Sequence, residues 1–594
     1  MADKTTGKAF DFKLFKRLLG HTKPYKWTFV FVAIAAIALS VFGVLSPIIL
    51  ESAIDEGILP KDWDLLIYFT ILMLGALLAE VLFQFSFIYY ANWLGQTVIR
   101  DIRVKLFKLM MSFRMKYFDK SAVGRLTTRA VNDIETIASI FSQGLFTIAS
   151  DLLKMLVILG VMLYKSWELT LISIAVMPIL IYATRVFQRA MKSAFEDVRN
   201  QVANLNTFVQ ERITGMKIVQ IFAREKEEYE SFQNINEAHK KAWVRTVWYN
   251  SIFFPIAEMS GAIALGLIVW YGGLHAVADD LAVDGDITLG LITAFIQLSQ
   301  MLFRPLRMIA DKFNTLQMGM VAANRVFTIL DTQSHIADEG AIELTDTKGA
   351  IQFKKVHFGY NEEEEVIKGI SFDVKPGETI ALVGATGAGK STIINLLSRF
   401  YEINSGEISI DGISIKEYTL QSLRKHIAVV LQDVFLFADS ILNNITLDEE
   451  SISEEEVIAA AKEIGVHQFI SSLPNGYHYN VKERGSMLSS GQRQLIAFLR
   501  AYVSNPSVLI LDEATSSVDS YSEELIQNAT DKITEGRTSI VIAHRLATIK
   551  KADQILVMDQ GKIVEKGTHH ELLKKENGFY KNLYEVQFLK EEAI

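Results

Sequence analysis

The fold of the C-terminal half of this 594-residue chain follows from one stretch, Thr379-Ile-Ala-Leu-Val383-Gly384-Ala-Thr-Gly-Ala-Gly389-Lys390-Ser391. Its first five residues form a short apolar run that is typical of a buried strand. The glycines let backbone N–H groups curl around a phosphate, and Ser391 to Phe400 is expected to open an amphipathic helix. Strand, glycine-rich loop and helix in this order predict a phosphate-binding loop, in which Lys390 meets the terminal phosphates and the Ser391 hydroxyl binds Mg²⁺. A glycine-rich turn beside a surface lysine is the simpler alternative.

Composition indicates two unlike halves. Hydrophobic residues make up 50% of the chain and charged residues 22%, and the mean hydropathy is positive, so the charges must be segregated along the sequence. A chain of this length is too long for a single core. The formal net charge of −8 gives no reason to expect nucleic acid as a partner. Because cysteine is absent, disulfides, thiolate metal sites and cysteine nucleophiles are excluded.

Long apolar stretches in the first half predict about six membrane spans, since about 20 apolar residues cross a bilayer. The fourth stretch is short and is interrupted by Pro178. Residues Met1 to Lys26 are charged and lack an apolar core, so we expect no cleavable signal peptide. The expected spans are Trp27 to Leu50, Leu65 to Tyr90, Leu145 to Tyr164, Leu169 to Tyr182, Ile252 to Tyr271 and Ile287 to Leu302.

Lysine and arginine placement predicts the orientation. The segment before the first span and the connections after the second and fourth spans are basic, whereas the first and fifth connections are mainly acidic. Since basic connections stay in the cytoplasm, the N-terminus and the C-terminal half are expected there. The two basic connections are long and have few glycines or prolines, so we expect helical hairpins with tips near Phe118 to Gly124 and Gly215 to Val219. A basic helix on the membrane surface is the alternative.

Further strands of the C-terminal half end in polar residues. Ile351 to Val356 alternates as a half-buried strand does. Val508 to Leu511 and Thr538 to Ala543 read as buried strands, and they end at Asp512-Glu513 and at His544. An open parallel sheet binds its ligand beyond the carboxyl ends of its strands, so these side chains are expected beside the phosphate loop.

These motifs follow the order of an ATP-binding cassette (ABC) ATPase. The chain carries Walker A at Gly384 to Ser391, then Gln432 after an apolar run, the signature Leu488-Ser-Ser-Gly-Gln492, Asp512-Glu513 and His544. With a membrane half in front, the chain resembles an ABC exporter half-transporter, similar to bacterial multidrug and lipid A exporters, over nearly its whole length. The resemblance implies an N-terminal all-α polytopic membrane domain, with about six transmembrane helices and long cytoplasmic extensions, followed by an α/β P-loop ATP-binding cassette domain.

The resemblance also implies an organisation and partners. We expect a transmembrane domain over residues 1–330, a linker over 331–348 and the ATP-binding cassette over 349–594. The expected cofactors are ATP and Mg²⁺. In the family, ATP lies between the Walker A of one chain and the signature of another, so a second half-transporter chain is expected, identical or related. The other expected partners are membrane lipid and an amphipathic substrate, with no nucleic acid. The expected location is the bacterial cytoplasmic (inner) membrane, with the N-terminus and the ATPase domain cytoplasmic.

Residue roles are carried over position by position. Glu513 is expected to polarise the attacking water, His544 to contact the terminal phosphate, and Gln432 to sense Mg²⁺ and nucleotide. The expected Mg²⁺ ligands are Ser391, Gln432 and Asp512. The expected nucleotide-binding residues are Tyr360, Gly384, Ala385, Thr386, Gly387, Ala388, Gly389, Lys390, Ser391, Thr392, Ser489, Gly491, Gln492 and Asp519. Asp519 lies in the loop by which the two cassettes of the family communicate.

Simpler interpretations exist for several of these residues. Tyr360, expected to stack on adenine, would otherwise be a half-buried strand residue. Asp512 and Glu513 would otherwise cap the next helix. His544 would otherwise form a local hydrogen bond.

Two departures from the family pattern bear on the partner. Ser490 stands where the signature commonly has its first glycine, and the sequence Ser516-Ser517-Val518-Asp519 lacks the frequent Ala-Leu before its aspartate. Such changes occur in exporters that pair two different chains, one of them with a damaged site. Because this chain keeps Glu513 and His544, it would be the intact member of such a pair.

Polar residues in the membrane half are either pathway residues or helix-to-helix hydrogen-bonding groups. Asp151 and Lys154 are expected to pair on one helical face. The residues concerned are Glu80, Gln84, Asp151, Lys154, Glu258, Gln297 and Gln300.

The sequence therefore predicts ATP-driven export or flipping of an amphipathic small molecule or lipid by a dimeric exporter. The alternatives are the catalytically intact subunit of a heterodimeric exporter and an ATP-gated channel or regulator on the same scaffold. A soluble DNA-repair or translation ATPase with the same cassette is disfavoured by the membrane spans. The substrate does not follow from the sequence.

Overall fold

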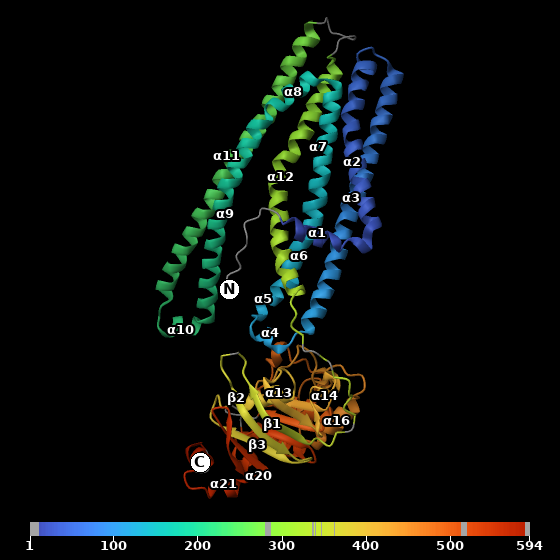
Figure 1. Ribbon diagram of the computed structural model, residues 1–594. Helices are drawn as coiled ribbons and strands as arrows, with labels where there is room; N and C mark the ends of the chain where they lie inside the picture. The colour runs from blue at the N-terminus through green and yellow to red at the C-terminus, as the bar shows by residue number, and fades with distance from the viewer. Residues whose placement is uncertain are drawn as a thin grey trace. The chain divides into compact units, whose positions relative to one another are not determined.

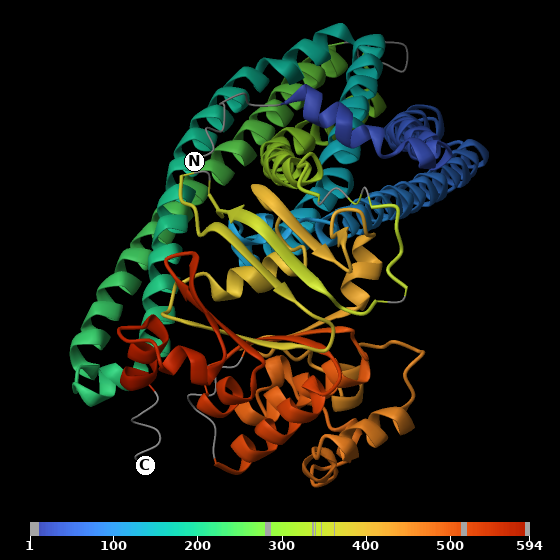
Figure 2. The same cartoon turned by 60° about the horizontal axis from the view of Figure 1, so that its bottom comes forward.

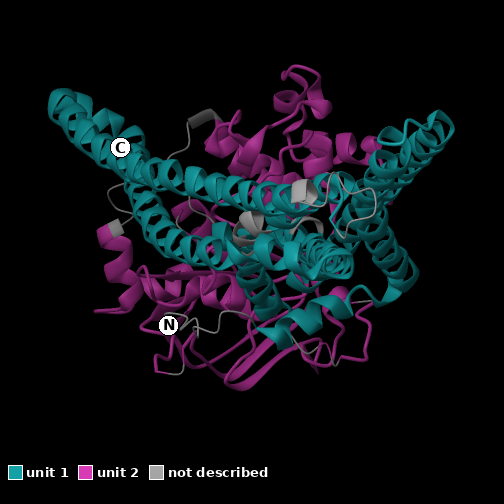
Figure 3. Ribbon diagram, turned by 90° about the horizontal axis from the view of Figure 1, so that it is seen from above, with its two compact units in different colours: residues 1–111, 123–333 teal, residues 112–122, 334–594 magenta. Residues whose placement is uncertain are grey.

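The computed structural model describes residues 11–278, 287–335, 338, 340–345, 347–361, 363–512, 520–543 and 545–587, without the side chains of 142–143, 276–278, 306–311, 313–314, 520–521 and 587. The chain forms two compact units, coloured separately in Figure 3. Unit 1 comprises residues 1–111 and 123–333, and unit 2 comprises residues 112–122 and 334–594. The short segment 112–122 thus belongs with the C-terminal half, although more than 200 residues separate the two in sequence.

Unit 1 is helical (Figure 1). Among its described residues, five helical stretches are long and apolar enough to cross a membrane, which confirms the predicted fold class of this half. The sixth predicted stretch lies at the start of α12 and remains a prediction as a span. The helices are α1 (Phe12–Gly20), α2 (Lys26–Ser52), α3 (Trp63–Met111), α5 (Val123–Thr128), α6 (Ile134–Ser139), α7 (Phe146–Lys165), α8 (Trp167–Ala175), α9 (Met177–Thr214), α10 (Met216–Ile221), α11 (Glu225–Ala278) and α12 (Leu289–Leu330).

Several of these helices run far beyond a bilayer's thickness. Helix α3 has 49 residues, α9 has 38 and α11 has 54, whereas about 20 suffice to cross. Helices α9 and α11 run side by side and are joined by α10, and α4 (Met115–Asp119) follows α3 (Figure 1). The predicted tip near Gly215 to Val219 coincides with α10, and the predicted tip near Phe118 to Gly124 spans the end of α4, a short turn and the start of α5. Proline in the first turn of α9 explains the break from α8, because proline lacks the N–H that a continuing helix needs.

The ionic contacts of α7 correct one prediction. Asp151 pairs with Lys312 of α12, and Lys154 lies 3.7 Å from the Glu80 carboxylate of α3. The expected pairing of Asp151 with Lys154 is wrong because each finds an opposite charge on a neighbouring helix. Gly43 of α2 makes room for this arrangement, since a Cβ there would lie 2.8 Å from the Lys154 ammonium nitrogen.

The described strands of unit 2 form two sheets. One is antiparallel, in the order β2-β1-β4-β5, and the other has the order β10-β9-β3-β8-β7-β6, in which β10 runs antiparallel to β9 and the remaining neighbours pair parallel. The strands are β1 (Ile351–Phe358), β2 (Ile367–Val374), β3 (Thr379–Gly384), β4 (Ser405–Ile410), β5 (Ile413–Ser414), β6 (Ile427–Val430), β7 (Val508–Asp512), β8 (Thr538–Ile542), β9 (Gln554–Asp559) and β10 (Lys562–Gly567). This α/β architecture confirms the predicted fold class of the second half.

The six-stranded sheet has a different apolar core on each face, because side chains alternate along each strand. Ile380 and Leu382 of β3 pack into the core that includes α13 (Lys390–Leu397) and the antiparallel sheet. Ala381 and Val383 pack into the core that includes α18 (Ser490–Val503). Helices α13 and α18 therefore lie on opposite faces, and Figure 2 shows the antiparallel strands in yellow apart from the orange helices.

The remaining helices of unit 2 complete these layers. They are α14 (Leu420–Lys425), α15 (Ile441–Thr446), α16 (Glu454–Glu463), α17 (His467–Ser471), α19 (Ser520–Thr534), α20 (Leu546–Lys551), α21 (His569–Leu573) and α22 (Phe579–Gln587).

Candidate functional site

Strand order brings the sequence motifs of unit 2 to one edge of the sheet. Strands β3 and β7 flank β8, with Leu382 and Asp512 both registered on Ile542. Strand β6 pairs with β7 on its other side. Since these strands are parallel, the phosphate loop after β3, Asp512 and the turn after β6 all lie beyond the carboxyl edge.

Two glycines of the phosphate loop are required by geometry. Gly384 has φ +153°, and a Cβ there would lie 2.2 Å from the Met558 carbonyl oxygen. Gly389 caps α13 in the left-handed region with φ +100°, and its Cβ would approach the Ile367 side chain to 2.8 Å. Residues 385–387 are exposed between them, while Ala388 is buried. The loop is thus held at both ends and open to solvent in the middle.

Lys390 is a buried cation at the start of α13. Its side chain is mostly covered, and its Nζ donates to the carbonyl oxygens of Gly384 at 2.7 Å and Ala385 at 3.0 Å. Burial lowers the pKa of Lys390, and the negative charge of Asp512 partly opposes this shift. An ammonium held at a helix N-terminus by two neutral carbonyls is well placed to exchange them for an anion.

Ser391 and Asp512 supply oxygen ligands next to this cation. The Ser391 hydroxyl donates to the Asp512 carboxylate at 3.4 Å, and Asp512 is 9% exposed at the end of β7. Among the residues that the structure describes, no three His, Asp or Glu side chains gather as a metal cluster. One hydroxyl and one carboxylate fit Mg²⁺, which usually takes one or two carboxylates and completes its shell with phosphate oxygens and water.

Tyr360 lies beside the first turns of α13. Its hydroxyl accepts a hydrogen bond from Asn395 Nδ2 at 3.2 Å and lies 3.3 Å from Thr392 Oγ1. Its ring meets the rings of Phe358 and Tyr401 edge-on, with centroids 4.9 and 5.1 Å apart. The structure therefore brings this residue to the phosphate loop. The prediction omitted Asn395, which lies three residues after Thr392 on the same helical face, a spacing that could have revealed it.

The signature residues form the N-terminal cap of α18. The Ser489 hydroxyl accepts the Gln492 N–H at 3.2 Å, and the Gln492 side chain accepts the Ser489 N–H at 2.9 Å. This capping box explains the Ser-x-x-Gln spacing. Ser490 is the first helical residue, so its backbone does not require glycine, and Gly491 is buried behind it.

The last four predicted residues follow strands β6, β7 and β8 in the chain. Gln432 follows β6 with an exposed side chain. Beside it lies a groove of about 580 Å³ whose walls include Leu431, Phe435 and Leu447. Glu513, Asp519 and His544 lie outside the described residues. In the chain, Glu513 directly follows β7, Asp519 directly precedes α19, and His544 comes two residues after the end of β8.

Comparison with known proteins places both halves in one family. The model of the ABC transporter transmembrane region matches residues 29–306, and the ABC transporter model matches residues 367–516. The chain is 36% identical to an ATP-dependent lipid A-core flippase of Haemophilus influenzae, over 97% of each chain. It is 35% identical to the uncharacterized ABC transporter ATP-binding protein YknV of Bacillus subtilis, over 99% of this chain and 96% of the relative. It is 36% identical to the probable multidrug resistance ABC transporter ATP-binding/permease protein YheH of the same organism, over 86% of this chain and 76% of the relative.

Proposed function

Because the chain belongs to the ABC transporter family, as an integral membrane half-transporter whose ATPase drives transport, we propose that it exports or flips an amphipathic molecule or lipid. The observation that carries this proposal is the buried Lys390 of the phosphate loop, beside Ser391 and Asp512, in the same chain as the membrane helices. The names of the flippase and multidrug relatives support an amphipathic substrate.

The nucleotide site would use these residues in distinct roles. Lys390 and the N–H groups of the loop bind the phosphates, and Tyr360 stacks on the adenine. Ser391 and Asp512, with Gln432 completing the set, hold Mg²⁺, which neutralises charge on the transferred phosphoryl group. Glu513 orients and deprotonates the attacking water, and His544 contacts the terminal phosphate.

A second chain would complete each site. Because α13 and α18 pack on opposite faces of the sheet, we propose that the ATP held by Walker A meets Ser489, Gly491 and Gln492 of another copy. Asp519 would communicate between the two cassettes. The helical backbone of Ser490 supports a functional signature in a homodimer. The unusual residues before Asp519 favour the second candidate, in which this chain is the intact subunit of a heterodimer.

We also propose domains over residues 1–330 and 349–594, joined by 331–348, and a place in the bacterial cytoplasmic membrane. The basic connections after the second and fourth spans support a cytoplasmic N-terminus and ATPase domain.

Transport by the purified chain in liposomes tests the proposal. Molecules that insert with the cassette on the outside of the liposome are accessible to added Mg-ATP. ATP should then drive a fluorescent phospholipid or a dye from one side of the membrane to the other. The Lys390→Ala chain provides the control without phosphate binding. Passive flux that ATP only gates would favour the channel alternative instead. Native mass measurement of the chain expressed alone distinguishes a self-paired chain from one that needs a related partner.

A further inference from the structure

Helix α1 has one face packed on the protein. Phe15 and Leu18 are buried, and they lie on the same side of the helix because they are three residues apart. Arg17 pairs with Asp331 at the C-terminal end of α12 at 2.6 Å, and its guanidinium lies 4.3 Å from the centroid of the Phe327 ring. These contacts hold α1 against the end of α12, so its opposite face points in a defined direction.

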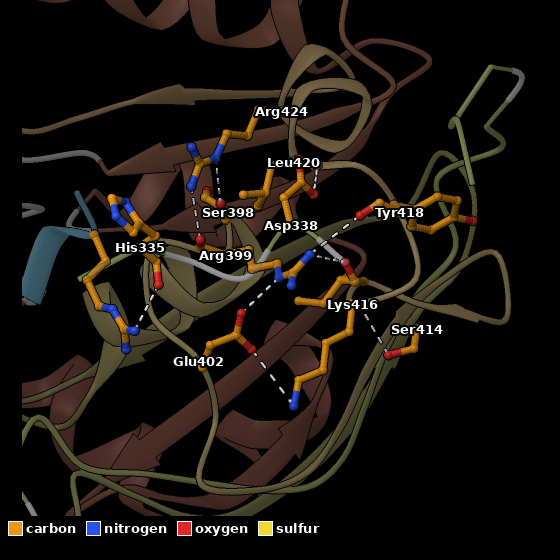
Figure 4. Close-up of polar contacts among 12 residues, drawn as sticks. His335, Asp338, Ser398, Arg399, Glu402, Ser414, Lys416, Tyr418, Leu420 and Arg424 are labelled. Carbon is orange, nitrogen blue, oxygen red and sulfur yellow. Dashed lines mark hydrogen bonds and ion pairs between the residues drawn. The ribbon is translucent and has the colours of Figure 1, made fainter. Parts of the chain in front are cut away.

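The chain on both sides of these contacts is also held. Beyond Asp331 it enters unit 2, where the Asp338 carboxylate accepts the Leu420 N–H at 3.0 Å (Figure 4). After α1, the Tyr25 hydroxyl donates to the Asp101 carboxylate of α3 at 2.6 Å. Helix α1 is therefore an integral part of the fold and not a loose N-terminal tail.

The 3₁₀-helix η1 (Lys23–Tyr25) places α1 at the surface of the membrane. It leads directly into α2, the first helix that is long and apolar enough to span a bilayer. Pro24 lacks the N–H needed to continue α1 into α2 as one helix, and α1 runs across the direction of α2 (Figure 1). The Tyr25 N–H donates to the Thr22 carbonyl at 2.8 Å, so the connection is compact and α1 lies beside the level at which α2 enters the membrane.

The exposed face of α1 and η1 is basic. Residues 12–26 contain no aspartate or glutamate. The nearby acids are occupied, because Asp11 caps α1, Asp101 accepts hydrogen bonds from Tyr25 and Arg100, and Asp331 pairs with Arg17. Four exposed lysines have no described carboxylate within ion-pair distance, and these are Lys13, Lys16, Lys23 and Lys26.

His21 lies within the same positive field. Burial lowers the pKa of His21, and the charges of Lys105 and Arg17 lower it further, while Asp101 partly opposes the shift. The cations around the end of α1 therefore outweigh the one acid that faces this imidazole. A surface with this excess of positive charge attracts anions.

Two aromatic side chains flank the lysines. Phe12 is 71% exposed and Trp27 is 77% exposed, and the Lys26 ammonium nitrogen lies 5.8 Å from the centroid of the Trp27 ring. Aromatic rings beside lysines are anchors at the level of lipid headgroups, where one group meets the acyl boundary and the other meets phosphate. The surface thus offers both contacts that a phospholipid can use.

We propose that this exposed face binds anionic phospholipids in the leaflet where α2 begins. Its four lysines meet the headgroup phosphates, and Phe12 and Trp27 enter the boundary with the acyl chains. The inference goes beyond the proposed function, because the lipid bound here belongs to the surrounding membrane and is not the transported molecule.

Native mass spectrometry of the purified full chain in detergent tests the binding, with phosphatidylglycerol and phosphatidylcholine as probes. Wild type should bind phosphatidylglycerol at least about ten-fold more tightly, because each lysine near an anionic surface contributes about five-fold in affinity before screening. Replacing the four lysines with glutamine should reduce this preference at least about five-fold and leave phosphatidylcholine binding unchanged. Replacing them with arginine keeps the charge and should retain the preference. The glutamine variant combines Lys13→Gln, Lys16→Gln, Lys23→Gln and Lys26→Gln.

A single label tests where the lipid binds. The chain has no cysteine, and a Cβ at Gly20 would meet no described atom within 4 Å, so Gly20→Cys accepts a fluorophore at the end of α1. In nanodiscs that contain phosphatidylglycerol, acrylamide, an uncharged quencher in water, should quench this label at least about two-fold less than in phosphatidylcholine nanodiscs. High salt should reduce the difference, because it screens the lysines.

A matched variant removes the same charge elsewhere. Four exposed lysines of the cassette replaced with glutamine should leave the preference for phosphatidylglycerol as in wild type, and they are Lys562, Lys566, Lys574 and Lys575. Glycerol phosphate, which has no acyl chains, should not displace phosphatidylglycerol.

Equal binding of the two lipids by wild type, or an unchanged preference in the α1 glutamine variant, would overturn the proposal. An equal loss of preference in the cassette variant would also overturn it, and displacement by glycerol phosphate would indicate a site for soluble anions instead. Because no measurement requires ATP hydrolysis, failure here leaves the proposed transport function untouched.

Discussion

At the scale of single residues, the polar groups of the candidate site already contact protein atoms that a bound nucleotide and its Mg²⁺ could replace. Lys390 donates to two loop carbonyls, and Ser391 donates to the Asp512 carboxylate. Phosphate oxygens could replace the carbonyls, and Mg²⁺ bound by both Ser391 and Asp512 would replace the hydrogen bond between them. Nucleotide binding would therefore exchange contacts at a site that is already assembled.

Replacing Glu513 with glutamine should separate binding from turnover. The amide cannot accept a proton from water, so turnover should fall by about 100- to 10,000-fold, or about 3 to 5 kcal/mol of barrier. ATP should still bind, as measured with a fluorescent nucleotide beside a steady-state ATPase assay. Turnover within a few-fold of wild type would show that Glu513 is not the base.

Two replacements of Tyr360 should separate its ring from its hydroxyl. Tyr360→Ala removes the stacking surface, worth about 1 to 3 kcal/mol, and should raise the KM for ATP about five- to 150-fold with kcat spared. Tyr360→Phe keeps the ring and loses the contact with Asn395, so its KM should lie much nearer wild type. An unchanged KM in Tyr360→Ala would return this residue to a purely structural role.

At the scale of helices and strands, the sequence predicted local structure better than it predicted contacts between distant residues. The apolar run from Thr379 to Val383 and the glycines after it predicted β3 and the start of α13 because both depend on neighbouring residues. The partner of Asp151 was missed because Lys312 lies 161 residues away, and proximity on one helix favoured Lys154 instead. The attachment of α4 through Tyr401 and Asp119 has no local signal at all.

The glycine of α2 provides a test at this scale. Gly43→Ala should push the Lys154 ammonium away from Glu80, which costs about 0.6 to 1.7 kcal/mol if the contact behaves like other polar contacts between membrane helices. In Gly75→Ala, no described atom lies within 4 Å of the new Cβ. In detergent, the Gly75→Ala chain should therefore unfold at a higher temperature than the Gly43→Ala chain. A higher unfolding temperature for Gly43→Ala would show that the contact between Lys154 and Glu80 contributes nothing to stability.

At the scale of the whole molecule, mixed dimers test whether the ATP site is shared. Lys390→Ala removes the phosphate contact, and Ser489→Arg places a bulky cation at the signature, so each homodimer should be inactive. If each site combines the Walker A of one chain with the signature of the other, a mixed dimer has both substitutions in one site and an intact second site. Random pairing gives about half mixed dimers, so up to about a quarter of wild-type ATPase activity should return on coexpression if one site can turn over alone.

Isolated mixed dimers, purified through two different affinity tags, supply the control. They should trap nucleotide at one site per dimer even if hydrolysis requires two. Dimers that neither trap nor hydrolyse nucleotide, while both parent chains assemble normally, would contradict a site shared through Lys390 and Ser489.

The membership of residues 112–122 in unit 2 has a consequence for the order of biosynthesis. Asp119 leaves the ribosome 282 residues before Tyr401, which at about 5 to 20 residues per second is a delay of roughly 14 to 56 s. During that interval α4 has been made but its docking surface has not. Residues 112–122 must therefore remain accessible until the C-terminal half has folded and can bind them. A cassette expressed from residue 334 onward would lack this segment altogether.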